Sequence, residues 1–309
     1  MRIVYMGTPE IARVILKALI NTRHEIIAVV SQTDKPKGRG GKVQFTPVKE
    51  EALAAGIPVY QPNTIKDDEF FNLLCELNPD IIVVAAYGKI LPKRIIDLPK
   101  LGCINVHASI LPKYRGAAPI QWVVINGEKT TGITIMHMDV GIDTGDMIIK
   151  REVVLDEKET SGTLNDKLAN CGGELLIEAL DLIEAGKAPR EKQNDEDATY
   201  YSMLTKELGH IDFTKSAVEI ERLIRGLNPW PSAYGFLDGK SFKIWSADVI
   251  LEDRDGEPGE IIDITKDTIL VKTGNGILSI KELQLEGKKR MTSDAFLRGF
   301  TLAIGTKIN

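Results

Sequence analysis

The chain has 309 residues, of which 43% are hydrophobic and 27% charged, as in an ordinary globular protein. Its net charge of −5 argues against nucleic-acid binding through bulk charge, so an RNA partner needs a local basic patch. No apolar run approaches the roughly 18 residues of a membrane helix. The three cysteines lie far apart and form no CxxC pair: Cys75, Cys103 and Cys171. We therefore expect buried free thiols and no metal site. Such cysteine usage also favours a cytoplasmic protein.

The first half of the chain alternates strand and helix patterns. An apolar strand is predicted over 2–6, and Thr8 with Pro9 predicts the start of a helix with Thr8 as its N-cap. Apolar residues then recur at helical spacing over 11–19. Further strands are predicted over 25–30, 80–85 and 104–107, with helices over 47–55 and 70–77. This alternation predicts an α/β fold, a Rossmann-like parallel sheet covered by helices.

The second half changes character after residue 186. Strands are predicted over 131–138 and 147–155, and a long helix follows over 164–183. A polar, aperiodic stretch then predicts a linker, and the residues beyond 206 give one helix and short strands separated by Gly-rich turns. We therefore expect a small C-terminal β-barrel of OB-like type. The expected domains are a catalytic domain over 1–189, a linker over 190–206 and a barrel over 207–309.

The most informative pattern is the pair Asn105 and His107 at the end of a predicted strand. Residues two apart in a strand point to the same face, so the two side chains lie together while Val106 packs behind them. The strand ends before Pro112 and Gly116, and ligands bind at this edge of open α/β sheets. A carboxamide and an imidazole at one point can polarise a carbonyl and move protons.

Asp143 lies in the loop sequence Gly-Ile-Asp-Thr-Gly-Asp. Gly141 and Gly145 on either side permit sharp turns and a close approach of the backbone to a ligand. If Asp143 lies near His107, its carboxylate orients the imidazole and favours the protonated form. A hairpin connection with merely solvated carboxylates fits the pattern equally well.

A basic Gly-rich loop lies between the second strand and the next helix, and it contains Lys37, Arg39 and Lys42. A flexible basic loop is suited to gripping phosphates, although a solvated surface loop has the same composition. The predicted C-terminal domain has only one local basic cluster, Lys288-Lys289-Arg290. The turn at Met6-Gly7-Thr8 lacks the GxGxxG pattern, so it gives little support for a dinucleotide site.

The string NVHASILPKYRG, followed by GIDTGD, resembles the 10-formyltetrahydrofolate-dependent formyltransferases. The resemblance implies that Asn105, His107 and Asp143 form the catalytic group. It implies that the folate donor binds the SLLP-like segment and an apolar segment near the pterin, which are Ser109, Ile110, Leu111, Pro112, Tyr87, Ile90 and Leu91. Ile110 stands where the family has Leu, a mild apolar change.

The resemblance extends over nearly the whole chain, from MGTPEIA through GRGGK to LNPWPSAYG. Within the family it is strongest to the members that formylate the α-amine of initiator methionyl-tRNA. It therefore implies 10-formyltetrahydrofolate as co-substrate, no metal, and initiator methionyl-tRNA as partner. The basic loop around Arg39, with Lys37 and Lys42, is then implied to meet the acceptor end of the tRNA, and the barrel is implied to bind tRNA. We expect a monomer.

Three other functions stay open on the sequence. An aminosugar-nucleotide formyltransferase shares the catalytic group but needs no basic loop. A formyltetrahydrofolate hydrolase would break down the donor without any acceptor. A non-catalytic tRNA-binding protein would leave Asn105, His107 and Asp143 without a purpose.

Overall fold

The computed structural model describes residues 1–37, 42–252 and 254–309. By their contacts the residues fall into two compact units, each described here by itself. Unit 1 comprises Met1–Pro119, Thr130–Val154 and Asn165–Tyr201; unit 2 comprises Ile120–Lys129, Leu155–Leu164 and Ser202–Asn309. The units divide the chain at other places than the domain boundaries expected above, which stay a prediction.

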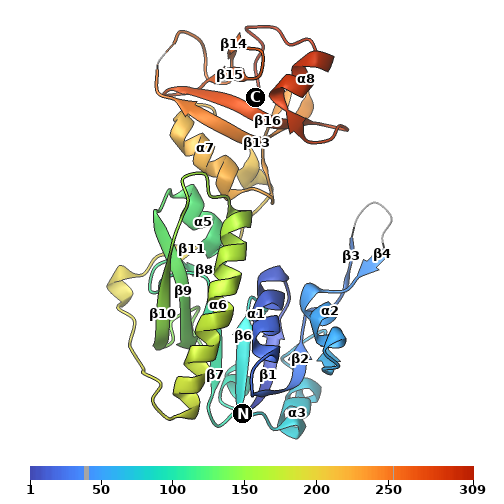
Figure 1. The fold of residues 1–309 in the computed structure, drawn as a ribbon, viewed down its shortest axis with the longest axis vertical. Coiled ribbons are helices and arrows are strands. Elements are labelled where there is room, and N and C mark those ends of the chain that lie inside the picture. The colour runs from blue at the N-terminus through green and yellow to red at the C-terminus, as the bar shows by residue number, and fades with distance from the viewer. Residues whose placement is uncertain (38–41, 253) are drawn as a thin grey trace. The chain divides into compact units, whose positions relative to one another are not determined.

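Unit 1 is built on a seven-stranded sheet (Figure 1). Five neighbouring strands are parallel to one another, and the remaining two are joined to the sheet by antiparallel pairings. In spatial order they are β5 (Val59–Tyr60), β2 (Glu25–Val30), β1 (Arg2–Gly7), β6 (Ile81–Ala85), β7 (Cys103–His107), β9 (Thr130–His137) and β10 (Met147–Val154). The strand order reverses between β1 and β6, and in open α/β sheets such a reversal marks the edge where ligands bind.

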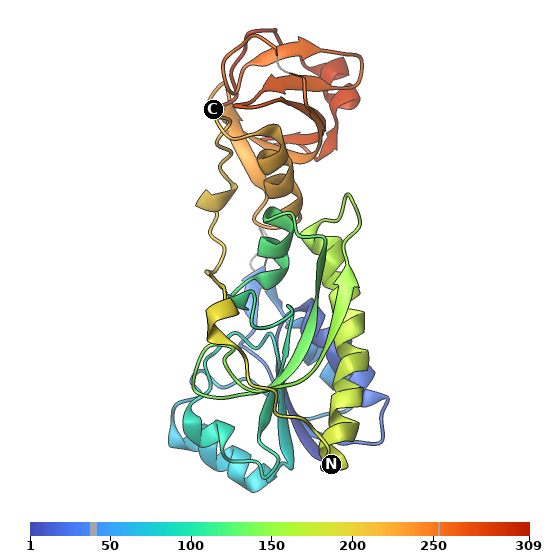
Figure 2. The same cartoon turned by 90° about the vertical axis from the view of Figure 1, so that its left-hand side faces the viewer.

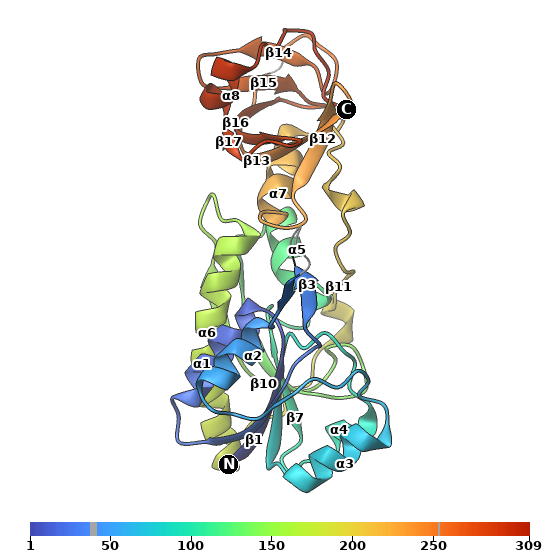
Figure 3. The ribbon, with the colours of Figure 1, turned by 90° about the vertical axis from the view of Figure 1, so that its right-hand side faces the viewer.

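Helices cover both faces of this sheet, as the sequence predicts. Figure 3 shows α3 (Asp68–Leu77) and α4 (Lys93–Ile96) on one side of the strands and α1 (Glu10–Ile20) and α6 (Ser161–Glu184) on the other. One apolar core joins α3 and α4 to β1, β2 and β6. On the opposite side α6 approaches α1 closely, since a Cβ on Gly173 would lie 2.7 Å from that of Ala18. Unit 1 also contains α2 (Pro47–Ala54), whereas α5 (Pro119–Ile125) belongs, apart from Pro119, to unit 2.

The predicted cap of the first helix is wrong. The helix begins at Glu10 with Pro9 as N-cap and no side-chain cap. The Thr8 hydroxyl instead donates to the carbonyl of Tyr87 at 3.2 Å and accepts from the backbone amide of Gln32 at 3.3 Å. Thr8 therefore ties the β1 turn to neighbouring loops. The prediction of three buried thiols also fails in part, because Cys75 is exposed and Cys171 is half-buried.

Short two-stranded ladders were not predicted. In place of a plain loop, β3 (Lys35–Lys37) and β4 (Lys42–Gln44) pair antiparallel and form the two legs of the basic segment. The expected linker also contains regular structure. Within it, β11 (Tyr200–Tyr201) pairs in parallel with β8 (Arg115–Gly116), so this stretch is bonded to unit 1.

Unit 2 contains the predicted C-terminal β domain (Figure 2). Its antiparallel sheet has the order β12 (Ala233–Leu237), β13 (Lys240–Ile250), β16 (Ile277–Leu285), β15 (Ile269–Lys272) and β14 (Ile261–Ile264), with β17 (Met291–Thr292) beside β16. Helices α7 (Ala217–Gly226) and α8 (Ser293–Gly299) complete it. Ser216 and Glu219 form a reciprocal capping box at the start of α7.

The C-terminal segment links the two outer strands of this sheet. Phe236 in β12 exchanges backbone hydrogen bonds of 2.7 and 3.0 Å with Asn309. Ile261 at the start of β14 donates to Thr306 and accepts from Gly305, both at 2.8 Å. These bonds satisfy the free edges of β12 and β14, as closure of a barrel does. No helix of the described residues is long and apolar enough to span a membrane.

Candidate active site

Asn105 and His107 lie on β7, between β6 and β9, as predicted. Val106 packs on the opposite face, where its Cγ1 lies 3.3 Å from the position of a Cβ built on Gly172 of α6. Asn105 and His107 therefore share the face that α6 does not cover. The Asn105 carboxamide is half-buried and has no hydrogen-bond partner among the described residues, so both of its amide hydrogens can meet a ligand.

The His107 imidazole is buried, and its two ring nitrogens have different neighbours. Nε2 lies 2.9 Å from the carbonyl oxygen of Tyr114, which can only accept, so Nε2 carries a proton. Nδ1 faces Asp143, with 3.6 Å between Nδ1 and Oδ1. That distance is too long for a hydrogen bond, so Nδ1 keeps its capacity to bind a reacting group while the carboxylate acts on it through charge.

Asp143 is held beside His107 by the backbone. Its Oδ2 accepts a 2.9 Å hydrogen bond from the amide of Gly116, and its side chain is only 15% exposed. The structure thus brings together the three residues of the predicted catalytic group, although Asp143 is 36 residues from His107 in the sequence. The strand exit at Tyr114–Gly116 contacts both partners, since Tyr114 accepts from His107 and Gly116 donates to Asp143.

The expected role of the flanking glycines is half right. Neither Gly141 nor Gly145 has a positive φ; Asp143 itself takes the left-handed turn, with φ 54°. Gly145 is required for close approach instead, because a Cβ there would lie 1.7 Å from the carbonyl oxygen of His137. Ala86 and Tyr114 are also left-handed, with φ 44° and 61°. Non-glycine residues in this region are strained and concentrate at functional sites.

Two residues beside Asp143 carry no signal that the sequence analysis recognised. Arg115 is a buried cation, 1% exposed, and it donates twice to the side-chain oxygen of Gln193. Gln193 in turn donates to the carbonyls of Asp143 and Gly145. Arg115 stands within the NVHASILPKYRG string, where its role as a partner of Gln193 has no sequence signature. Gln193 lies in the aperiodic stretch assigned to the linker, where no pattern distinguishes it.

The residues predicted to hold the folate donor divide by exposure. Ser109 and Leu111 are buried, and the Ser109 hydroxyl is used within the segment, donating to the Lys113 carbonyl at 2.7 Å. Ile110 and Pro112 are half-exposed and Ile90 is 73% exposed, so these three offer apolar surface to a ligand. The role of the segment as a folate site stays a prediction.

Tyr87 and Leu91, also predicted near the donor, are buried in the core beneath β1 and β6. Burial raises the pKa of Tyr87 to about 12, so the phenol is neutral at physiological pH. Its hydroxyl has no hydrogen-bond partner in the described part of the chain. A buried polar atom without a partner is uncommon and favours a ligand or water nearby.

The predicted tRNA contacts fall on the β3–β4 segment. Lys37 ends β3 and pairs through the backbone with Lys42, which begins β4. Arg39 lies outside the described residues. The root of the segment is well anchored, because Lys49 binds the Asp34 carboxylate at 2.5 Å and Gln61 at 2.7 Å.

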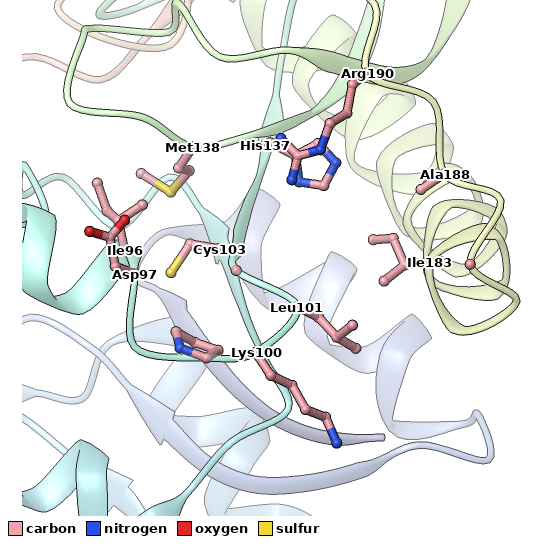
Figure 4. Close-up of a pocket in the computed structure, with 13 residues that line it drawn as sticks. Ile96, Asp97, Lys100, Leu101, Cys103, His137, Met138, Ile183, Ala188 and Arg190 are labelled. Carbon is pink, nitrogen blue, oxygen red and sulfur yellow. The ribbon is translucent and has the colours of Figure 1, made fainter.

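A cavity of about 480 Å³ lies at the other end of β7, away from His107 (Figure 4). Its wall includes Cys103 at the start of β7, His137 at the end of β9, and Arg190. Burial lowers the pKa of His137, and the nearby Arg190 cation lowers it further. None of the residues predicted for catalysis or folate binding lines this cavity.

The family models match both halves of the chain. A model described as formyl transferase matches residues 1–180, and one described as formyl transferase, C-terminal domain, matches residues 203–301. Solved structures with the same fold include the sugar 3N-formyl transferase WlaRD, at 21% identity and a TM-score of 0.67 over 94% of this chain and 99% of that one. HypX from Aquifex aeolicus in complex with tetrahydrofolic acid has 17% identity and a TM-score of 0.65, over 96% of this chain and 47% of that one. Fold and domain content thus define a formyl transferase.

Two similar proteins specify the kind of formyl transferase. The methionyl-tRNA formyltransferase of Agathobacter rectalis is 57% identical over 299 residues, 97% of this chain and 96% of that protein. The enzyme of the same name from Clostridioides difficile is 54% identical over 305 residues, 99% of each chain. The chain belongs to the methionyl-tRNA formyltransferase family. The resemblance drawn from the residues is confirmed.

Gly145→Ala tests whether the backbone of the Asp143 loop is set by its contact with His137. The added methyl group must displace the loop by more than 1 Å, because its Cβ would overlap the His137 carbonyl. Misplacement on that scale costs about 10²-fold in rate, and we expect kcat to fall by that amount. Gly299→Ala is the control, since nothing lies within 4 Å of its Cβ position and its φ is not positive. Equal kcat for both variants in a formyl-transfer assay would contradict the proposed constraint.

Proposed function

We propose that the chain transfers the formyl group of 10-formyltetrahydrofolate to the α-amino group of methionyl initiator tRNA. The products are N-formylmethionyl-tRNA and tetrahydrofolate, for use in translation initiation. The observation that carries the proposal is the group formed by the free carboxamide of Asn105, the inward-facing Nδ1 of His107 and the Asp143 carboxylate 3.6 Å from it. Membership of the methionyl-tRNA formyltransferase family supplies the substrate class.

The chemistry follows from the properties of the three side chains. The formyl carbon is an amide-like electrophile, and attack by the free amine places negative charge on its oxygen. Asn105 and protonated His107, through Nδ1, donate hydrogen bonds to that oxyanion, while Nε2 remains bonded to Tyr114. Asp143 stabilises the imidazolium and helps a proton pass from the amine to the departing nitrogen. These roles need no covalent enzyme intermediate, and we keep the expectation that no metal takes part.

The two substrates are assigned to different surfaces. The accessible apolar side chains of Ile90, Ile110 and Pro112 suit the donor's ring system. For the acceptor we propose Lys37, Arg39 and Lys42 as contacts, with the barrel of unit 2 as a further tRNA-binding region. The aminosugar alternative has no use for this basic segment. We further propose a monomer in the cytoplasm, where charged tRNA is used.

The acceptor assignment is tested by formyl transfer from 10-formyltetrahydrofolate to three acceptors: charged initiator tRNA, free methionine and an aminosugar nucleotide. We expect turnover with the charged tRNA alone. Transfer to the sugar nucleotide at a similar kcat/KM would favour the aminosugar alternative. Release of formate at an equal rate without any acceptor would favour the hydrolase.

Arg39→Ala tests the basic segment. The whole chain is acidic, so tRNA binding must rest on local charge. We expect a lower kcat/KM for tRNA and unchanged binding of the folate donor. If Arg39 meets a phosphate, the slope of log affinity against log salt becomes shallower by roughly 0.7–0.9. If it stacks on a base of the single-stranded acceptor end, affinity falls and the slope holds.

Arg23→Ala is the control, because Arg23 is an exposed arginine of unit 1 that is bound to Asp181 and Glu184 instead. It should leave tRNA affinity and its salt slope unchanged. If Arg39→Ala behaves like this control, the basic segment is only a solvated surface.

A further inference from the structure

Gln193 bridges the loop that carries Asp143. Its Nε2 donates one hydrogen bond to the carbonyl of Asp143 and another to that of Gly145, both at 2.8 Å. The amide nitrogen has two hydrogens, so both are used on carbonyls that flank Thr144. The two bonds therefore set the path of the backbone on which the Asp143 carboxylate is mounted.

Arg115 fixes which way the Gln193 amide points. Its Nε and Nη2 donate to Oε1 of Gln193 at 3.0 and 2.9 Å. A guanidinium offers donors only, so the amide oxygen must face Arg115 and the amide nitrogen must face the loop. Arg115 is itself held, because Nη2 binds Asp195 at 2.8 Å and Nη1 donates to the Tyr200 hydroxyl at 2.6 Å. These hydrogen bonds of Arg115 leave the Gln193 amide only one orientation.

The same strand residues also hold the Asp143 side chain. Gly116, next to Arg115 in β8, donates its backbone amide to Oδ2 of Asp143. The backbone amide of Arg115 donates to the carbonyl of Thr199 at 2.8 Å. The main chain of Asp143 is thus fixed through Gln193, and its carboxylate is fixed through Gly116. Both constraints meet at Arg115–Gly116.

Asp143 needs such support because of its backbone. Its φ of 54° is unfavourable for a residue with a Cβ, and such conformations persist only where the surroundings enforce them. Without the two bonds to its flanking carbonyls, the loop can relax toward an ordinary φ. The carboxylate would then leave its place 3.6 Å from the His107 ring nitrogen.

We propose that Gln193, oriented by the buried Arg115, is a positioning residue that holds the Asp143 carboxylate beside the His107 imidazole for formyl transfer. This inference rests on the proposed function and deepens it. Gln193 donates both amide hydrogens to the backbone and has no part in the proton transfers. Its contribution to the rate therefore passes through Asp143.

Gln193→Glu is the sharpest test, because the side chain keeps its shape. One carboxylate oxygen still accepts from Arg115, while the other replaces the donating nitrogen and faces two carbonyl oxygens. The loop must open, and we expect kcat to fall about 10²-fold, as for other small misplacements of a reacting group. KM for tRNA and for the folate donor should stay within about twofold, because the loss falls on the transition state.

Two further variants separate positioning from general damage. Asp195→Asn weakens a different partner of Arg115, one that is 83% exposed, and should leave kcat within about twofold. Gln193→Met removes both hydrogen bonds without adding charge, and it substitutes for Gln193→Glu if that variant does not fold. Thermal melting verifies that each variant is folded before its kinetics are read.

A double-mutant cycle with Asp143→Asn decides the assignment. If Gln193 acts through Asp143, Gln193→Glu should cost less than about threefold in the Asp143→Asn background, and this result supports the inference. A full 10²-fold loss in that background overturns it. So does a folded Gln193→Glu or Gln193→Met enzyme with wild-type kcat. Failure of the proposed function is distinct, since Asp143→Asn alone would then leave kcat unchanged.

Discussion

We expect His107→Ala to lower kcat by roughly 10²–10⁴-fold, the range usual for loss of a general acid–base group. The imidazole is the only part of the site that can both donate to the oxyanion and exchange a proton. The loss should fall on kcat, while KM for the folate donor changes little, because the assigned interactions form in the transition state. Steady-state kinetics with charged initiator tRNA measures both constants.

An isostere of His107 tests which ring nitrogen matters. Glutamine at position 107 can place its amide nitrogen where Nε2 donates to Tyr114, but it lacks a group at Nδ1. His107→Gln should therefore be as inactive as His107→Ala while regaining stability. His137→Gln is the matched control, since His137 is a buried histidine at the end of β9 with no predicted role. Wild-type turnover in folded His107→Gln would refute the role of Nδ1.

Asn105→Ala belongs to the same prediction, because Asn105 supplies the other donor. Removal of one oxyanion donor commonly costs about 10²–10³-fold in rate. Asn105→Asp keeps the shape and replaces the donor with an acceptor, so it should be no more active than Asn105→Ala. Near-wild-type kcat in either folded variant would show that the carboxamide does not face the oxyanion.

The parts of the fold that the sequence predicts are those set by local pattern. The apolar run 81–85 is buried on both faces, and such strands are readable as continuous hydrophobic stretches. The i, i+2 spacing of Asn105 and His107 likewise predicts their shared face, because strand geometry leaves no alternative. Asp143 joined the predicted catalytic group only through the family resemblance. Its closeness to His107 could not be predicted from the spacing of residues along the chain.

The errors arise where a tertiary contact overrides a local preference. Thr8 has the chemistry of an N-cap, but its hydroxyl bonds to the Tyr87 carbonyl, which is distant in sequence. The role of Gln193 was not predicted, for a related reason. Its partners in the loop are backbone carbonyls, and every sequence supplies these, so no pattern of side chains records the contact. The sharp turn expected of the glycines beside Asp143 is made by Asp143 itself, and the constraint on Gly145 is the space beside His137.

Asp143→Asn should lower kcat by roughly 10²–10⁴-fold while the loop keeps its conformation. The amide oxygen of asparagine can still accept from Gly116, and the backbone bonds to Gln193 do not depend on the side chain. The variant therefore removes the charge and little else. Thermal melting close to that of the wild type would confirm that the structural part of the site survives.

The loss in Asp143→Asn follows from the charge that is removed. A carboxylate beside an imidazole stabilises the imidazolium that the proposed reaction uses, and the neutral amide of asparagine does not. Asp146→Asn is the control, since Asp146 lies in the same loop but faces Arg190, with 3.8 Å between them. If folded Asp143→Asn keeps the kcat of this control, the Asp143 carboxylate does not support His107 in catalysis.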